Sequence, residues 1–227
     1  DPGDPDQSGQ SFTMSPAPAN AHYRLGVLTD GVATMQPAVR DNFQAAVAAM
    51  ADICEVEELS LPDLPYAAVC WGIMLAEAAS AFEDLIDSGQ VAELIAPENR
   101  IGGFVADLIP ARSYVRALRV RRLIRQELAA LTSAYDAIVT PTVGAVAPPL
   151  GVRFSEYYGQ WGQTSLIAAV NVAGLPAITV PTGFGDRGLP TAMQFMAGPF
   201  AENRLIHLAA AYQARTDWHR RHPAGLD

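Results

Sequence analysis

Lysine is absent from this sequence, and all fifteen basic side chains are arginine. Any reaction in which a lysine serves as the base is therefore beyond these 227 residues on their own. Acidic residues outnumber basic ones, which gives a formal net charge of −9. Nucleic acids and anionic membranes attract proteins through excess Lys and Arg, so neither is an expected partner. We expect a small molecule or another protein instead.

Cysteine is also scarce. Cys54 and Cys70 are too few for a disulfide framework, and the amino terminus lacks the charged start and apolar run of a secretion signal. We therefore expect a cytoplasmic protein. The spacing of the four histidines and two cysteines matches no metal-binding pattern, so we predict no metal and no cofactor.

Long uninterrupted apolar runs are missing as well. Residues 157–185 carry no charged side chain over a length that would span a bilayer. However, Gly159, Gly162, Pro176 and Pro181 interrupt this segment, together with several amide side chains. Because no single apolar helix fits it, we interpret the segment as buried globular core and expect no membrane partner.

Half of the residues are apolar, which is enough for one sizeable core. Residues 1–22 are rich in Pro, Gly, Ser and Asp and show no helical or strand period, so they predict a loop or linker. Residues 24–31 predict a strand, 37–51 an amphipathic helix and 54–59 a second strand. A strand, a helix and a strand in such close succession form a βαβ unit, which implies parallel strands in a layered α/β fold.

Further helices and strands follow along the chain. After Pro65, a helix is predicted whose apolar stripe packs in the core: Trp71, Leu75, Ala78, Phe82 and Leu85. Trp71, at one end of this stripe, is also within reach of a pocket. The other predicted elements are a helix over 110–133 with Val120, Ile124, Leu128 and Leu131 inward, a strand over 137–142, a helix over 157–170, two strands within 171–199, and a last helix that buries Leu205, Leu208, Ala209 and Tyr212.

Three patterns invite functional interpretations that their context does not favour. The G-x-G-x-x-G match at 183–188 leads into Leu189-Pro190 and an extended apolar run, so it predicts a reversal between strands rather than a nucleotide site. Five arginines between 116 and 125 are interpreted as a solvated helix face. No G-x-S-x-G occurs, and we expect His207 to pack half-buried and the other histidines to be solvated.

Several motifs recur in a consistent order along nearly the whole chain. They are Asp1-Pro2-Gly3-Asp4, RLGVLTDG at 24–31, Glu77-Ala78-Ala79, YDAIVTPT at 135–142, and the block NVAGLPAITVPTGFGDRGLPTAMQFMAGP at 171–199. Together they resemble the closing half of the amidase signature family, whose members hydrolyse amides with a Ser/Ser/Lys triad. The resemblance implies an α/β fold in which a mixed β-sheet is sandwiched between helical layers, with this chain supplying the second half. Residues 1–22 would then be the linker that follows the missing catalytic half, and 23–227 the carboxyl-terminal part of a single amidase domain.

The same resemblance implies the function. The enzyme would hydrolyse a carboxylic amide to an acid and ammonia or an amine, with no catalytic residue in this chain. The amino-terminal catalytic half of the same amidase is the expected partner. Trp161, Thr164 and Ala168 lie three and four residues apart on the predicted helix, so we expect them to share a face that contacts substrate together with Thr140, Thr142 and Trp71. Ordinary packing of that helix on the sheet is the alternative.

Two other functions stay open. One is the A subunit of a tRNA-dependent glutamine amidotransferase, in which an acidic residue seven positions before the Asn recognises the glutamine amino group. Thr164 stands at that position here, before Asn171, which favours an apolar or aromatic amide over glutamine. The other is a non-catalytic binding module derived from an amidase.

Overall fold

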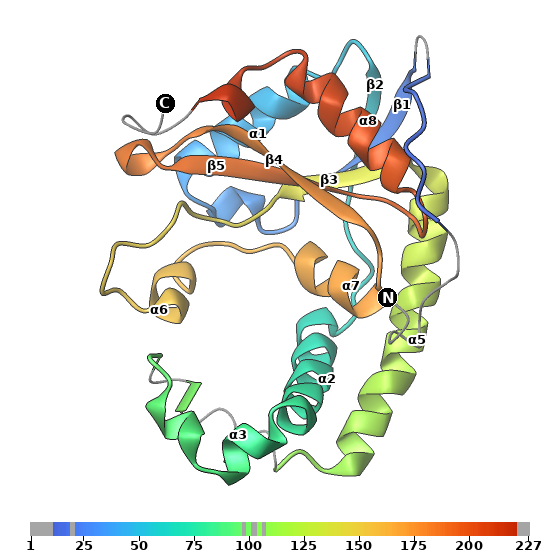
Figure 1. Cartoon of the computed structure of the whole chain (residues 1–227). Coiled ribbons are helices and arrows are strands. Elements are labelled where there is room, and N and C mark those ends of the chain that lie inside the picture. The colour runs from blue at the N-terminus through green and yellow to red at the C-terminus, as the bar shows by residue number, and fades with distance from the viewer. Residues whose placement is uncertain (1–10, 19–20, 97–98, 101–103, 106–107, 222–227) are drawn as a thin grey trace.

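A single five-stranded sheet organises the chain (Figure 1). The computed structural model describes residues 11–18, 21–96, 99–100, 104–105 and 108–221. The strands are β1 (Tyr23–Leu28), β2 (Cys54–Leu59), β3 (Ala137–Pro141), β4 (Ala177–Phe184) and β5 (Pro190–Met196), and they lie in the order β2-β1-β3-β5-β4. β1 is parallel to β2 and to β3, whereas β5 is antiparallel to both β3 and β4, so the sheet is mixed.

The predicted βαβ unit is confirmed. β1 and β2 pair in parallel over their full lengths, from Tyr23 opposite Cys54 to Leu28 opposite Leu59. Helix α1 (Pro37–Ala48) connects them and begins at Pro37, where a missing N–H costs no helical hydrogen bond.

The glycines at 183–188 make a strand reversal, as predicted. β4 runs into a 3₁₀ turn, η3 (Asp186–Gly188), and the chain returns as β5. Gly183 and Gly188 adopt positive φ angles of 149° and 68°, which side-chain-bearing residues rarely take.

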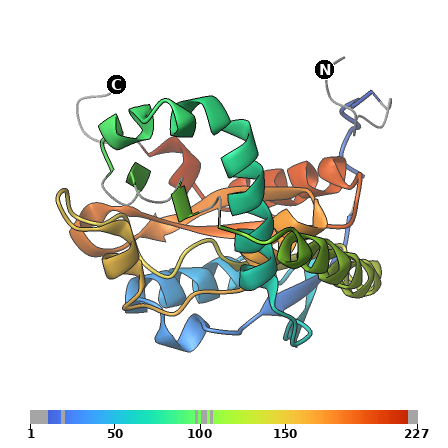
Figure 2. The same ribbon diagram turned by 90° about the horizontal axis from the view of Figure 1, so that it is seen from below.

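Helices cover both faces of the sheet, which confirms the predicted layers (Figures 1 and 2). On one face, α1 and α8 (Glu202–Gln213) pack on the largest core cluster, which includes Leu25, Val139 and Phe195. On the other face, α7 (Leu166–Ala173) lies on Leu28, Ile138 and Met196. Two longer helices, α2 (Tyr66–Ala81) and α5 (Ala111–Ala134), then pack against α7. The shorter elements are α3 (Glu83–Asp87), α6 (Phe154–Tyr158) and the 3₁₀ turns η1 (Val32–Thr34), η2 (Gln90–Glu93) and η4 (Trp218–Arg220).

The buried faces of α5 and α8 agree with their periodicity. Ile124 and Leu128 are buried on α5, with Val120 and Leu131 partly buried beside them. All four predicted residues of α8 are buried.

The prediction of one helix over 157–170 is wrong. α6 ends at Tyr158, α7 begins at Leu166, and residues 159–165 form a loop. Gly162 donates its backbone N–H to the Thr34 carbonyl oxygen at 2.9 Å. A continuous helix would turn that N–H inward to a carbonyl four residues earlier, so the tertiary contact replaces the helical one.

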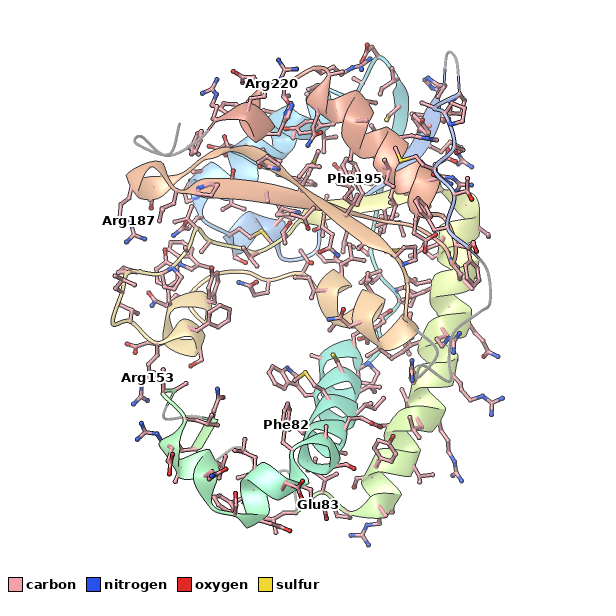
Figure 3. All side chains as sticks on the ribbon, in the orientation of Figure 1. Phe82, Glu83, Arg153, Arg187, Phe195 and Arg220 are labelled. Carbon is pink, nitrogen blue, oxygen red and sulfur yellow. The ribbon has the colours of Figure 1, made fainter. Side chains whose placement is uncertain are left out.

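The prediction that the α2 stripe is buried is also wrong. Trp71 and Phe82 are each 58% exposed, and only Tyr66 and Val69 are buried on α2. α2 carries one charged residue, Glu77, so its apolar pattern does not single out one face. Figure 3 places Phe82 at the α3 end of α2 and Phe195 within the sheet beneath α8.

The described part of the predicted linker, 11–18, forms neither helix nor strand and lies against α8. Asn203 accepts the Ser15 N–H at 3.1 Å and donates to the Thr13 carbonyl at 2.9 Å. His207, half-buried as predicted, places Nε2 2.8 Å from the Ser15 carbonyl. His22 is exposed, but His219 is half-buried with its Nδ1 enclosed, contrary to the prediction. His222 and the Asp1–Asp4 motif lie outside the described residues.

No helix in the described parts of the chain is long and apolar enough to cross a membrane.

Candidate functional site

Three loops meet at the edge of the sheet where β1 and β3 end. They are 29–36 after β1, 142–146 after β3, and 159–165 before α7. Because β1 and β3 are adjacent and parallel, their carboxyl ends deliver the first two loops side by side. Gln36 donates its backbone N–H to the Gly144 carbonyl at 2.9 Å, which joins the first loop to the second. The hydrogen bond from Gly162 to Thr34 joins the third loop to the first.

Glycines allow the three loops to approach this closely. A Cβ at Gly144 would overlap the Gly162 carbonyl oxygen, and one at Gly162 would overlap that of Gly31. Gly31 also has φ of 76° and faces the Gln163 backbone. Backbone therefore packs directly on backbone, and a side chain at any of these glycines would force the loops apart.

Gln36 joins two of these loops through its side chain. It is 3% exposed, its Oε1 accepts the Val146 N–H at 3.1 Å, and its Nε2 donates to the Tyr157 hydroxyl at 3.0 Å. Tyr158 adds a weaker bond to the Val146 carbonyl at 3.4 Å. Sequence reasoning missed Gln36 and the tyrosine pair, because Gly31, Gly144 and Gly162 come together only in the folded chain.

Thr142, Trp161 and Thr164, three of the sequence-predicted residues, lie on the adjoining second and third loops. The Thr142 hydroxyl and the Trp161 Nε1 are enclosed, and neither has a hydrogen-bond partner among the described residues. Buried polar atoms normally have partners, so these two are candidates to bind a ligand. Thr164 accepts the Leu166 N–H at 3.3 Å and so supports the start of α7.

The remaining predicted residues lie apart from this pair. Thr140 is fully buried in β3, with its hydroxyl 3.5 Å from the Leu28 carbonyl. Ala168 packs with the α2/α5/α7 cluster, and Trp71 is exposed on α2. The predicted shared helix face of Trp161, Thr164 and Ala168 does not exist, because the first two precede α7.

Beside α2, a groove of about 280 Å³ is lined by Cys70, Ile73, Met74, Arg121, Asn171 and Val172. Arg121 donates its Nε to the Val172 carbonyl at 2.8 Å, at the carboxyl end of α7. A guanidinium there is favoured, since helix carboxyl ends carry partial negative charge.

The three loops are almost free of charge. Asp30 is their sole carboxylate. It accepts hydrogen bonds from the Ser60 hydroxyl at 2.9 Å and the Leu61 N–H at 3.1 Å. Burial, and secondarily Tyr157, raises the pKa of Tyr158 above its ordinary value. No side chain on these loops is therefore suited to take a proton from a hydroxyl nucleophile near neutral pH. The arrangement can bind and orient a neutral polar group, but it holds no base.

The described residues contain no group of three or more His, Cys, Asp or Glu side chains that could hold a metal ion.

Comparison with known proteins assigns the chain to a family. A family model described as Amidase matches residues 1–206. The chain belongs to the amidase family. Among curated relatives, the A subunit of glutamyl-tRNA(Gln) amidotransferase from Methylococcus capsulatus is 39% identical over 113 residues, which cover 50% of this chain and 23% of the relative. The corresponding protein of the same name from Synechococcus elongatus is 27% identical over 237 residues, covering 94% of this chain and 49% of the relative. This amidase-family chain thus spans at most about half the length of these relatives.

Solved structures agree with the fold. A crystal structure titled as an amidase superposes with a TM-score of 0.76 at 22% identity, covering 91% of this chain and 48% of that one. The native peptide amidase from Stenotrophomonas maltophilia gives 0.67 at 24% identity, covering 92% and 46%. The mixed sheet between helical layers is therefore the amidase signature fold, of which this chain forms about half.

Proposed function

We propose that this chain is the carboxyl-terminal part of an amidase that hydrolyses a carboxylic amide to an acid and ammonia or an amine. In this proposal the Ser/Ser/Lys triad belongs to an amino-terminal half of the same enzyme, which is the partner of this chain. One observation carries the proposal: on a family member that spans half its relatives, a loop cluster with a single, already hydrogen-bonded carboxylate contains two enclosed, unpaired polar atoms and no side chain suited to act as the base. Binding groups without a catalytic base suit one wall of a shared active site.

Thr142 and Trp161 are the residues we propose to contact the polar part of the substrate. A hydroxyl can donate to or accept from an amide, and the indole N–H can donate to its carbonyl oxygen. Gln36, by tying Val146 to Tyr157, would hold these two loops in register. Thr140, fully buried in β3 two residues before Thr142, would support that loop from the strand.

Trp71 and Ala168 are proposed to line the part of the pocket that takes the substrate's apolar side. Trp71 is 58% exposed on a helix with a single charge, and burial of an aromatic ring against substrate would contribute apolar contact there. Together with the neutral Thr164, this favours an apolar or aromatic amide. A cytoplasmic location stays a prediction from the sequence.

The A subunit of a glutamine amidotransferase is the second candidate, because both curated relatives described above carry that name. A charged substrate ammonium would need a carboxylate near it, and the three loops offer only Asp30, which is already hydrogen-bonded. A non-catalytic binding module is the third. Hydrolysis of glutamine in preference to simple amides would favour the second candidate, and a stable, inert lone chain the third.

The test is activity of the assembled enzyme. We expect this chain, co-produced with the amino-terminal half of the longer protein, to purify as a complex by native mass spectrometry and to hydrolyse an aryl amide. Trp161→Ala, which removes the indole, should lower kcat/KM at least about tenfold. Trp161→Phe keeps an aromatic ring but removes the N–H donor, and Trp218→Ala serves as a remote control. Amide turnover by these 227 residues alone would overturn the proposal.

A further inference from the structure

A row of arginines on α5 faces solvent. Arg112, Arg116 and Arg119 lie four and three residues apart, so they share one face of the helix, and we call them the basic row. All three are exposed, and none forms an ion pair with another described residue. α5 contains six arginines and one glutamate, whereas the whole chain has a net charge of −9. The rest of the molecule is therefore strongly acidic, and the basic row is its exception.

Apolar side chains and a hollow accompany the basic row. Val115 lies three and four residues from Arg112 and Arg119, Leu123 lies four residues after Arg119, and both apolar side chains are exposed. The described lining of a hollow of about 510 Å³ consists of the basic row with Ser113 and Val115. Interfaces between proteins combine apolar contacts with charged ones. This face of α5 offers both.

An acidic segment lies on the elements that follow α2. α3 and η2 carry Glu83, Asp84, Asp87 and Glu93, and residues 83–95, which we call the acidic segment, contain no basic residue. All four carboxylates are exposed, and none forms an ion pair with another described residue. Ile95, at the end of the segment, is 94% exposed. The acidic segment thus also combines charge with exposed apolar area.

The basic row and the acidic segment lie at the same end of the molecule. α3 begins directly after α2, and Tyr114 in the first turn of α5 donates its hydroxyl to Glu77 in the last turn of α2. Figure 1 shows α3 and the start of α5 at the end of α2 that points away from the sheet, and Figure 3 places Glu83 there. One end of the molecule therefore carries exposed charges of both signs.

We infer that this end is an interface between two copies of the enzyme, in which the basic row of each copy contacts the acidic segment of the other. A twofold axis brings the same surface of both copies together, so that surface must be complementary to itself. Patches of opposite sign at one end satisfy this requirement. The net charge of −9 does not oppose the contact strongly, because exposed charges more than roughly 8 Å apart are largely screened at physiological ionic strength. A nucleic acid is a poorer occupant, because its phosphates would also approach the acidic segment.

Charge reversal tests the inference on the enzyme assembled from this chain and its amino-terminal half. We expect sedimentation equilibrium to show two copies of the assembled enzyme in one particle. Arg112→Glu with Arg116→Glu should raise the dissociation constant of that dimer at least about tenfold, since repulsion replaces attraction at both symmetry-related contacts. Arg125→Glu with Arg220→Glu is the matched control. It changes the net charge equally at exposed positions outside the basic row and should leave the dimer nearly unchanged.

A charge swap gives a second measurement. Glu83→Arg with Asp87→Arg should also prevent self-association. A mixture of this variant with Arg112→Glu/Arg116→Glu should form a mixed dimer, because each reversed patch then meets a patch of opposite sign. A monomeric parent, a dimer that survives both reversals, or a mixture of folded variants that stays monomeric would overturn the inference.

Amide hydrolysis by the same samples separates this inference from the proposed function. The interface involves neither Thr142 nor Trp161, so we expect the monomeric variants to retain activity. A parent that hydrolyses amides as a monomer would overturn the interface alone. An inert dimer would overturn the proposed function alone.

Discussion

The helices on the two sides of the sheet bury their apolar side chains to different degrees. On the α1/α8 face, the core cluster buries residues from every strand, with Phe195 and Leu208 fully enclosed. On the other face, α2 buries only Tyr66 and Val69 and leaves Trp71, Met74 and Phe82 largely exposed. Large apolar side chains exposed together are typical of an interaction surface. The contrast supports the proposal that another part of the enzyme covers the α2 side.

Core truncation should give the largest effect and tests the contrast directly. We expect Phe195→Ala to lower the free energy of unfolding by about 3–5 kcal/mol, because it leaves a cavity at a fully buried site. Phe82→Ala, at a 58% exposed site, should change it by less than about 0.5 kcal/mol. Urea unfolding measures both, and a similar loss in the two variants would show that the α2 face is already packed.

Loop packing should give the next largest effect. Gly144→Ala places a methyl group against the Gly162 carbonyl, so we expect a loss of about 1–3 kcal/mol as the loops separate. Gly72→Ala is the matched control, because nothing lies near its added Cβ and alanine favours the helix by about 0.5–1 kcal/mol. Thermal unfolding should therefore move in opposite directions. A harmless Gly144→Ala would mean that the loop contact is not tight.

The Gln36 bonds should matter somewhat less. Gln36→Ala leaves the enclosed Val146 N–H and the Tyr157 hydroxyl without their partner, at a cost of about 1–3 kcal/mol. Gln44→Ala removes an exposed glutamine from α1, the helix that follows Gln36, and should have little effect. Chemical denaturation of the three proteins compares them, and near-ultraviolet circular dichroism follows the environment of Trp161. Equal stability of the two variants would remove Gln36 from the site.

The smallest expected effect comes from the ion pair between Asp52, after α1, and Arg215, after α8, whose charged atoms are 2.7 Å apart. The hydrogen bond from Arg215 lowers the pKa of Asp52 below its ordinary value. A carboxyl group whose pKa is lowered by folding adds stability at pH values above its ordinary pKa. That stability is lost as the pH falls through the lowered pKa. The parent should therefore lose slightly more stability than Asp52→Asn between pH 5 and pH 2, as thermal unfolding in low salt can measure. Identical pH profiles would show that this exposed pair contributes nothing.

Much of the fold follows from the sequence, but the site follows only in part. The alternating apolar pattern and the turn residues correctly predict all five strands, and the 3.6-residue period predicts the buried faces of α5 and α8. Thr142 comes from a family motif, whereas Trp161 comes from a helical spacing that the structure contradicts, and the contact of either residue with substrate stays a prediction. Gln36 and Tyr157, which lie 121 positions apart, become neighbours only when β1 and β3 align. Local periodicity carries no information about such a pairing.

By itself, the sequence determines the strands, their layered α/β arrangement, the family and the lack of a lysine base, because these depend on residue type and short-range spacing. Only the tertiary structure decides that 159–165 is a loop, since Gly162 bonds to Thr34 rather than within a helix. It also decides which side chains of α2 stay exposed. Those outcomes depend on which segments, distant in the sequence, bond to the same backbone groups and cover the same apolar surface. Such contacts exist only once the chain has folded.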